Sequence, residues 1–170
     1  MLSLLVIATI SIGSYGQEAQ LEDTEVASVA VVANQIDIDY ARIALKKSNN
    51  KEILEFANRM VNDHNAVIGQ AVALVNKLGV NPKDNAISQS LLMDAEKTMK
   101  KLERTSKRKF DLAYINNEVA YHKAVIAAVN SVLIPEAEND ELKQLLSDVV
   151  PALEAHLGHA EMVQKNIKAQ

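Results

Sequence analysis

Residues 51–78 constrain the fold more than any other stretch, because apolar side chains recur there at every third or fourth position. This spacing is typical of an amphipathic helix that buries one face. Gly79 and Pro82, which follow it, are typical of a helix end. His64 stands in the middle of the apolar stripe. The sequence therefore predicts a long helix that carries an ionisable side chain into the core.

A second stretch, residues 116–126, repeats this pattern around His122. Aligning the two histidines also aligns four pairs of identical apolar residues: Val61 with Val119, Ala66 with Ala124, Val67 with Val125 and Ile68 with Ile126. Both histidines thus occupy core positions on long helices. The repetition indicates a paired polar feature inside the protein.

The same periodicity predicts five helices, and no segment alternates with period two for long enough to form a strand. Their expected ranges are residues 25–47, 51–78, 87–102, 107–133 and 140 to the C-terminus. Pro151 interrupts the last of them, so we expect a kink or a restart there. Long helices joined by short loops favour antiparallel neighbours. The expected fold is all-α, an antiparallel up-and-down four-helix bundle with an extra short helix.

The composition suits packed helices and argues against several classes of function. Aromatic residues make up only 4% of the chain, and there is no tryptophan. The net charge of −4 argues against a nucleic-acid partner, which normally meets a basic face. The chain has no cysteine, no Gly-x-Ser-x-Gly motif and no glycine-rich phosphate loop. We therefore assign no catalytic or nucleotide-binding residues, and an enzyme is less expected than a binding or structural protein.

The start of the chain has the pattern of a secretory signal peptide. Residues 1–16 carry no charge, and a short apolar run gives way to small residues, although the usual initial Lys or Arg is missing. The run is too short to span a bilayer, which takes about 20 apolar residues. We expect residues 1–16 to be a signal peptide, 17–27 a flexible lead-in and 28–168 a single domain. The protein would then be periplasmic, outer-membrane-associated or secreted, with no spanning segment in the mature chain.

Five polar residues fall on the apolar faces of the predicted helices: Asp37, His64, Glu118, His122 and His156. Asp37 precedes Asn50 by 13 residues, and His64 follows it by 14. At about 1.5 Å per residue, these two side chains lie at nearly the same height in an antiparallel pair of helices. A meeting of all five near the middle of the bundle is therefore geometrically allowed.

Two arrangements could satisfy these buried groups, because an unpartnered carboxylate or imidazole is strongly unfavourable in a core. One is a structural hydrogen-bond network that fixes the helix register. The other is a shared transition metal, and imidazole with carboxylate suits Zn, Fe, Mn or Cu. Glu118 and His122 are four residues apart, so the Glu-x-x-His pair of di-iron bundles is missing. A ferroxidase-like or catalase-like redox protein is thus the least expected function. His159, the fourth histidine, is not assigned to the site because its side chain can simply face solvent.

Basic residues cluster between positions 100 and 109, around Thr105 and Ser106. Such a run is typical of a solvated turn between helices. The alternative is a patch for an anionic partner. The protein would in that case be a cell-envelope interaction module without metal.

Four motifs, in order along the chain, resemble those of an exported bacterial family known as domain of unknown function 4142. They are Asn34-Gln-Ile-Asp-Ile-Asp39, Phe56-Ala-Asn-Arg-Met-Val-Asn-Asp-His64, Tyr114-Ile-Asn-Asn-Glu-Val-Ala-Tyr-His122 and Leu153-Glu-Ala-His-Leu-Gly-His-Ala160. The resemblance covers about residues 29–167. It implies a ferritin-like helical bundle without an established activity, in a family whose members are often described as outer-membrane or periplasmic proteins.

The resemblance also implies positions for the family's polar residues. Its Asp-His pair corresponds to Asp63-His64, and the acidic residue of its first motif corresponds to Asp37. Many members repeat Asp-His in a later helix, where this chain has Tyr121-His122. This chain therefore lacks the second aspartate of the family's pattern.

Overall fold

The computed structural model describes residues 20–169, and this part of the chain is almost entirely helical and contains no strand. Five long helices account for most of it. Their bounds are α1 Asp23–Lys47, α2 Lys51–Leu78, α3 Ala86–Arg104, α4 Lys107–Ala128 and α6 Asp140–Lys168, with a π-helical turn η1 Val129–Leu133 and a short α5 Ile134–Glu136 between the last two. The predicted all-α class is confirmed.

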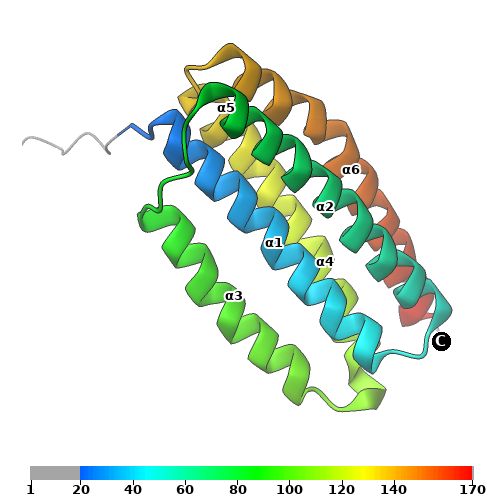
Figure 1. Ribbon diagram of the computed structural model, residues 1–170. Helices are drawn as coiled ribbons and strands as arrows, with labels where there is room; N and C mark the ends of the chain where they lie inside the picture. The colour runs from blue at the N-terminus through cyan, green and yellow to red at the C-terminus, as the bar shows by residue number, and fades with distance from the viewer. Residues whose placement is uncertain (1–19, 170) are drawn as a thin grey trace, which may run out of the picture.

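Four of the helices form the bundle, and α3 lies outside it (Figure 1). Helix α1 packs against α2 and α4, and α6 packs against the same two helices from the other side. Every neighbouring pair in this ring is antiparallel. Helix α3 packs on α1 and returns the chain to the end of the bundle where α4 starts. It is the extra helix that the sequence predicts, and it replaces the long crossover loop of other bundles.

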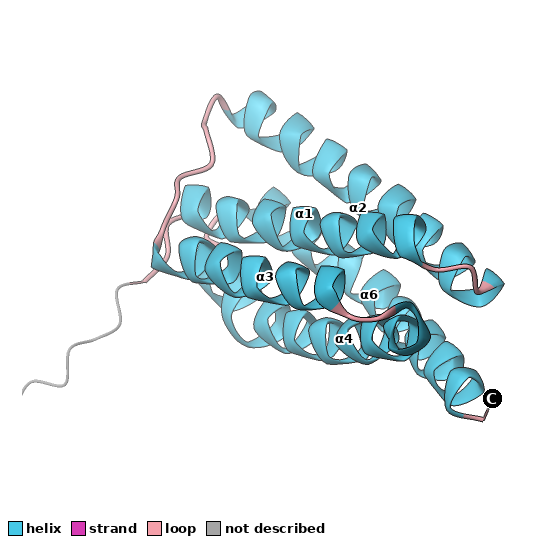
Figure 2. Cartoon of the chain, turned by 90° about the horizontal axis from the view of Figure 1, so that it is seen from below, coloured by secondary structure: helices cyan, strands magenta, loops and turns pink. Residues whose placement is uncertain are grey.

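The loops lie at the two ends of the bundle (Figure 2). Three of the helices that follow them begin with an asparagine cap, because a side-chain oxygen can satisfy the free amides of a first turn. Asn50, Asn85 and Asn139 each accept from two such amides. Gly79 ends α2 with a φ of 67°, a left-handed conformation that favours glycine.

Three details differ from the expected ranges. Helix α1 begins at Asp23, inside the segment expected to be a flexible lead-in, because Glu22 and Glu25 form a capping box and Val26 is buried. Helix α6 continues through Pro151 without a restart. Pro151 is exposed, so the carbonyl that it leaves without an amide donor can be solvated. The end of α4 turns π-helical at Val129. The expected signal peptide, residues 1–16, lies outside the described residues.

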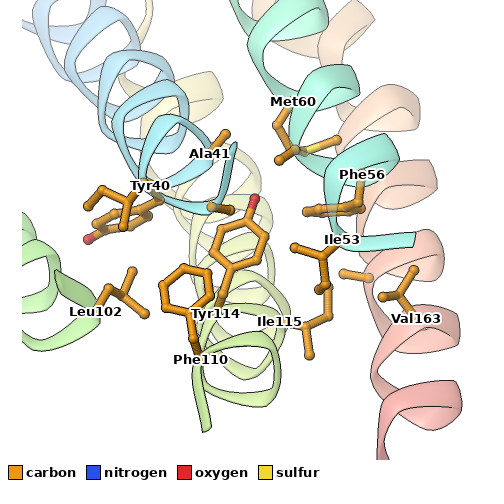
Figure 3. Packing of buried hydrophobic residues seen from close by; sticks show 14 of the residues in the cluster. Tyr40, Ala41, Ile53, Phe56, Met60, Leu102, Phe110, Tyr114, Ile115 and Val163 are labelled. Carbon is orange, nitrogen blue, oxygen red and sulfur yellow. The ribbon is translucent and has the colours of Figure 1, made fainter. Parts of the chain in front are cut away.

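Two apolar clusters fill the bundle, one toward each end. The aromatic core, shown in part in Figure 3, lies where α1 meets α2 and α3 meets α4. We call the other cluster the aliphatic core. The main members of the aromatic core are Ile36, Tyr40, Ile43, Ile53, Phe56, Met60, Leu102, Phe110, Tyr114, Ile115 and Val163. The aliphatic core consists of Val26, Val29, Val129, Leu133, Ala137, Leu142, Leu146 and Leu153.

The boundary between the two cores is polar. Along α6, His156 lies between Leu153 of the aliphatic core and Val163 of the aromatic core. None of the helices within residues 20–169 combines the length and the apolar character needed to cross a membrane. The distinctive feature of this bundle is thus a polar layer in its interior.

Candidate metal centre

All five polar residues predicted for the core lie at this boundary, and all are buried. They are Asp37 on α1, His64 on α2, Glu118 and His122 on α4, and His156 on α6, and none is more than 4% exposed. We call the three histidines with Asp37 and Glu118 the histidine layer. The ring centroids of the histidines lie 5.3 to 5.9 Å apart. The structure therefore brings together every residue of the predicted set.

Asp37 lies at the centre of the layer. Its Oδ2 atom is 2.9 Å from Nε2 of His64 and 3.3 Å from Nε2 of His122. The carboxylate of Glu118 is 3.8 Å from Nδ1 of His122. The equal heights of Asp37 and His64 expected from their distances to Asn50 are thus realised, because α1 and α2 are antiparallel around that turn.

Each histidine uses one ring nitrogen to contact an oxygen other than the carboxylate oxygens of the layer. His64 Nδ1 is 2.7 Å from Oδ1 of Asn34, and the side-chain amide of Asn34 is oriented by its own donation to a backbone carbonyl. His122 Nδ1 is 3.0 Å from the carbonyl oxygen of Glu118, and His156 Nε2 is 2.8 Å from Oδ2 of Asp63. These oxygens only accept hydrogen bonds. The three outer nitrogens must therefore carry the protons.

The other ring nitrogens point into the layer as bare lone pairs. Nε2 of His64, Nε2 of His122 and Nδ1 of His156 have no hydrogen-bond partner among residues 20–169, and neither has either carboxylate oxygen of Asp37. The 2.9 Å contact between His64 and Asp37 lacks the alignment of a hydrogen bond. A lone pair and a carboxylate at this distance repel each other unless a cation, either a proton or a metal ion, lies with them.

The donor atoms form two groups, and those of each group are close enough to hold an ion. Those of His64, His122 and His156 lie within 4.8 Å of one another, and so do those of Asp37, Glu118 and His122. His122 belongs to both groups and links them. An outer hydrogen bond on each imidazole is the arrangement that metal-binding histidines usually show, because it fixes the tautomer and the ring.

Burial and neighbouring charges set the protonation of the layer. Burial alone would raise the pKa of Asp37, but His64 and His122 outweigh it and hold that pKa below its ordinary value. Burial and the charge of Asp37 raise the pKa of Glu118 well above its usual range, so this carboxyl favours its neutral form. Burial lowers the pKa of His122 and lowers that of His156 to about 4. Neutral forms of His122 and His156 beside the Asp37 carboxylate suit a transition metal, because an imidazole must be unprotonated at the nitrogen that binds the ion.

Two residues of the site were not predicted as such. Asn34 and Asp63 hold the outer nitrogens of His64 and His156. Asn34 stands one helical turn before Asp37, and Asp63 precedes His64 directly, but both lie beside the apolar stripes and not in them. His159 lies outside the layer and packs against the ring of Phe56, with 5.2 Å between ring centroids.

A cavity of about 700 Å³ reaches the layer from the aliphatic core. Asp37 and the three histidines line one end of it, whereas Glu118 does not line it. Most of its other walls are aliphatic side chains of α1, α2, α4 and α6.

Comparisons with known proteins agree with this architecture. The model of the family described as domain of unknown function DUF4142 matches residues 13–163. A solved structure of CopM in the Cu(II)-bound form has the same fold, with a TM-score of 0.63 over 86% of this chain and 98% of that chain. The two sequences are 18% identical, so this likeness concerns the fold alone. A search of the curated proteins gives no match.

Proposed function

This chain belongs to the family of the domain of unknown function DUF4142, and we propose that it binds one transition-metal ion in the histidine layer. The observation that carries the proposal is the orientation of three buried imidazoles. Each has its outer nitrogen tied to an oxygen, and each turns its inner nitrogen, without a partner, toward the others. A metal ion satisfies all three lone pairs at once.

A purely structural hydrogen-bond network explains this arrangement less well. Such a network needs a donor opposite each buried acceptor, because unpaired acceptors are costly in a core. The inner nitrogens and the Asp37 carboxylate are all acceptors when the outer nitrogens carry the protons. The proton of a neutral Glu118 carboxyl is then the one donor of the layer, too few for several facing lone pairs, which favours a bound cation.

His64, His122 and His156 would hold the ion, with Asp37 as the fourth ligand. Asn34, Asp63 and the carbonyl of Glu118 would orient the imidazoles, since partners of this kind usually fix metal-binding histidines. A bound ion supplies positive charge that offsets the buried carboxylate. We propose a binding role and no redox cycle, because the Glu-x-x-His pairs of di-iron bundles are missing.

Copper and zinc are the first ions to test. Imidazole ligands suit Zn, Cu and Fe, and Cu(II) forms the strongest complexes of the divalent series. CopM, which has the same fold, has been solved in a Cu(II)-bound form. Manganese is a weaker candidate because it prefers carboxylate and water oxygens, whereas most of the proposed ligands are imidazoles.

Metal content and affinity test the proposal directly. The purified protein is reloaded with Cu(II) or Zn(II), dialysed and measured by elemental analysis, and we expect about one ion per chain for a single site of four ligands. The double variant His64→Ala/His122→Ala should hold none. His159→Ala is the matched control, because it removes a histidine outside the layer, and it should keep the ion. A reloaded wild type that holds no metal after dialysis, and whose melting temperature a chelator leaves unchanged, would refute metal binding.

We also propose that the protein is exported. The support is the uncharged apolar run of residues 1–16 with small residues at its end. Expression of the full chain, followed by cell fractionation and N-terminal sequencing, should place the mature protein outside the cytoplasm with a start near Gln17. An uncleaved chain in the cytoplasmic fraction would contradict this.

A further inference from the structure

The cavity beside the histidine layer has the size and walls of a small-molecule site. Its volume of about 700 Å³ falls within the range of typical ligand pockets. Leu133, Leu142, Leu146 and Leu153 of the aliphatic core line it, together with Val29. The cavity is partly open to solvent, so a ligand can enter it, and its aliphatic walls favour an aliphatic occupant.

The polar atoms of the cavity that lack partners gather at one end. His64, His122 and His156 are each at least nine-tenths buried, and their inner nitrogens face this end without a hydrogen-bond partner within the described chain. A wall with all its free polar atoms at one end and aliphatic carbon elsewhere suits an amphiphile. Such a ligand has an aliphatic body and one polar head.

The charge at the end of the cavity beside the histidine layer determines which polar head the ligand carries. This step rests on the proposed metal site. A divalent ion held by three neutral imidazoles and the Asp37 carboxylate keeps one net positive charge, since the nearby Asp63 carboxylate is already paired with Arg59 at 3.2 Å. An uncompensated charge beside an apolar cavity is unfavourable. A carboxylate head supplies the missing negative charge and an oxygen ligand for the ion.

We propose that the cavity binds an aliphatic monocarboxylate of the fatty-acid class, with its chain among the aliphatic core and its carboxylate at the ion of the histidine layer. The π-helical turn at Val129–Leu133 agrees with a binding role for this half, since both of its end residues are buried, both line the cavity, and such turns often mark functional sites. The aliphatic walls of the cavity and the net positive charge at its end determine this ligand class.

Dodecanoate is the probe, and two alanines of α2 provide a matched pair of variants. Ala71 is buried and lines the cavity, whereas Ala73 is exposed and does not line it. Both changes to leucine have nearly the same helix propensity cost. Dodecanoate binding is measured by calorimetry on metal-loaded wild type, Ala71→Leu and Ala73→Leu. We expect Ala71→Leu to weaken binding at least tenfold with unchanged metal content, and Ala73→Leu to change it less than twofold.

A second measurement reports the head. Dodecanoate should shift the visible spectrum of the Cu(II)-loaded protein, whereas acetate at the same concentration should not, because it lacks the chain. Equal affinities of Ala71→Leu and Ala73→Leu, or no dodecanoate binding to protein that holds its metal, would overturn the proposal while the metal site stands. If the chain holds no metal, the proposed function fails. If dodecanoate binds with equal affinity in the presence and absence of added metal, its carboxylate does not bind the ion, and that part of the proposal is refuted.

Discussion

The two halves of the bundle are packed differently on either side of the histidine layer. In the aromatic core, Tyr114 packs against Phe56 and Phe110 with centroid distances of 6.2 and 6.1 Å. The aliphatic core contains no aromatic ring among its buried members and borders the cavity. Packed rings therefore fill the aromatic half, whereas the aliphatic half leaves open space beside the histidine layer.

The most direct test of this difference is to make the same truncation in both halves. Leu102 of the aromatic core and Leu146 of the aliphatic core are 2% and 3% exposed. Leu102→Ala leaves a new dry void and should lower the free energy of unfolding by about 4 kcal/mol. Leu146→Ala enlarges an existing space and should cost about 2.5 kcal/mol, near the lower end for such changes. Urea titrations with equal slopes provide the measurement, and equal losses would show that both halves are equally filled.

Acid should destabilise the boundary between the halves. Burial, against the opposing hydrogen bond to Asp63, lowers the pKa of His156 to about 4. An unfolded histidine has a pKa of about 6.5, so the unfolded chain binds more protons between pH 6.5 and pH 4. Stability therefore falls as the pH falls through this window, by roughly 3 kcal/mol from this one group, and the loss from this group ends below pH 4.

The measurement compares metal-free wild type with His156→Gln at pH 7 and pH 4. The variant should start less stable at pH 7 but lose roughly 3 kcal/mol less on acidification, because glutamine does not titrate. Parallel losses in the two proteins would show that His156 is not held neutral by its surroundings.

The sequence could predict the helices and the layer for one reason: both follow from apolar periodicity. Gly79 and Asn50 marked helix ends, and an ionisable residue within an apolar stripe marked each member of the layer. Asn34 and Asp63 lie at the edge of their stripes, where a polar residue is ordinary, so their contacts with His64 and His156 were not visible. The cavity depends on how far apart the helices stand, and the π-turn at Val129 depends on a shift of backbone hydrogen bonds. Neither quantity has a periodic signature.

The residues that accept hydrogen bonds from the outer nitrogens of the histidines also differ between the two halves. Two of them line the cavity. Asn34 and Asp63 do so, whereas His122 is held by the carbonyl of Glu118, one turn toward the aromatic core. Asn34→Ala and Asp63→Ala should each weaken Cu(II) or Zn(II) binding by roughly 10- to 100-fold, as expected when the orienting partner of a ligand is lost. Competition with a coloured chelator measures the affinities, and Asn62→Ala, an exposed neighbour, is the control. Unchanged affinity in both variants would mean that packing alone orients the rings.

The smallest effects should come from the helix caps at the two ends of the bundle, and they decide whether the halves unfold together. Asn50 caps α2 beside the aromatic core with contacts of 2.9 and 3.4 Å, and Asn139 caps α6 beside the aliphatic core with contacts of 3.0 and 3.1 Å. Loss of either cap costs about 1 kcal/mol locally. If the aromatic half opens only in global unfolding, Asn50→Ala should lower the global free energy of unfolding by the full amount.

Asn139→Ala should act differently, because the less densely filled half can open by itself. Hydrogen exchange at the first turns of α6 should quicken about fivefold, while the global free energy changes by less than about 0.5 kcal/mol. If both variants instead lower the global free energy of unfolding equally and have the same effect on local hydrogen exchange, the two halves form one cooperative unit. The cavity would then be a fixed feature of the folded bundle, and access to the histidine layer would have to come through its existing opening rather than through local unfolding of the aliphatic half.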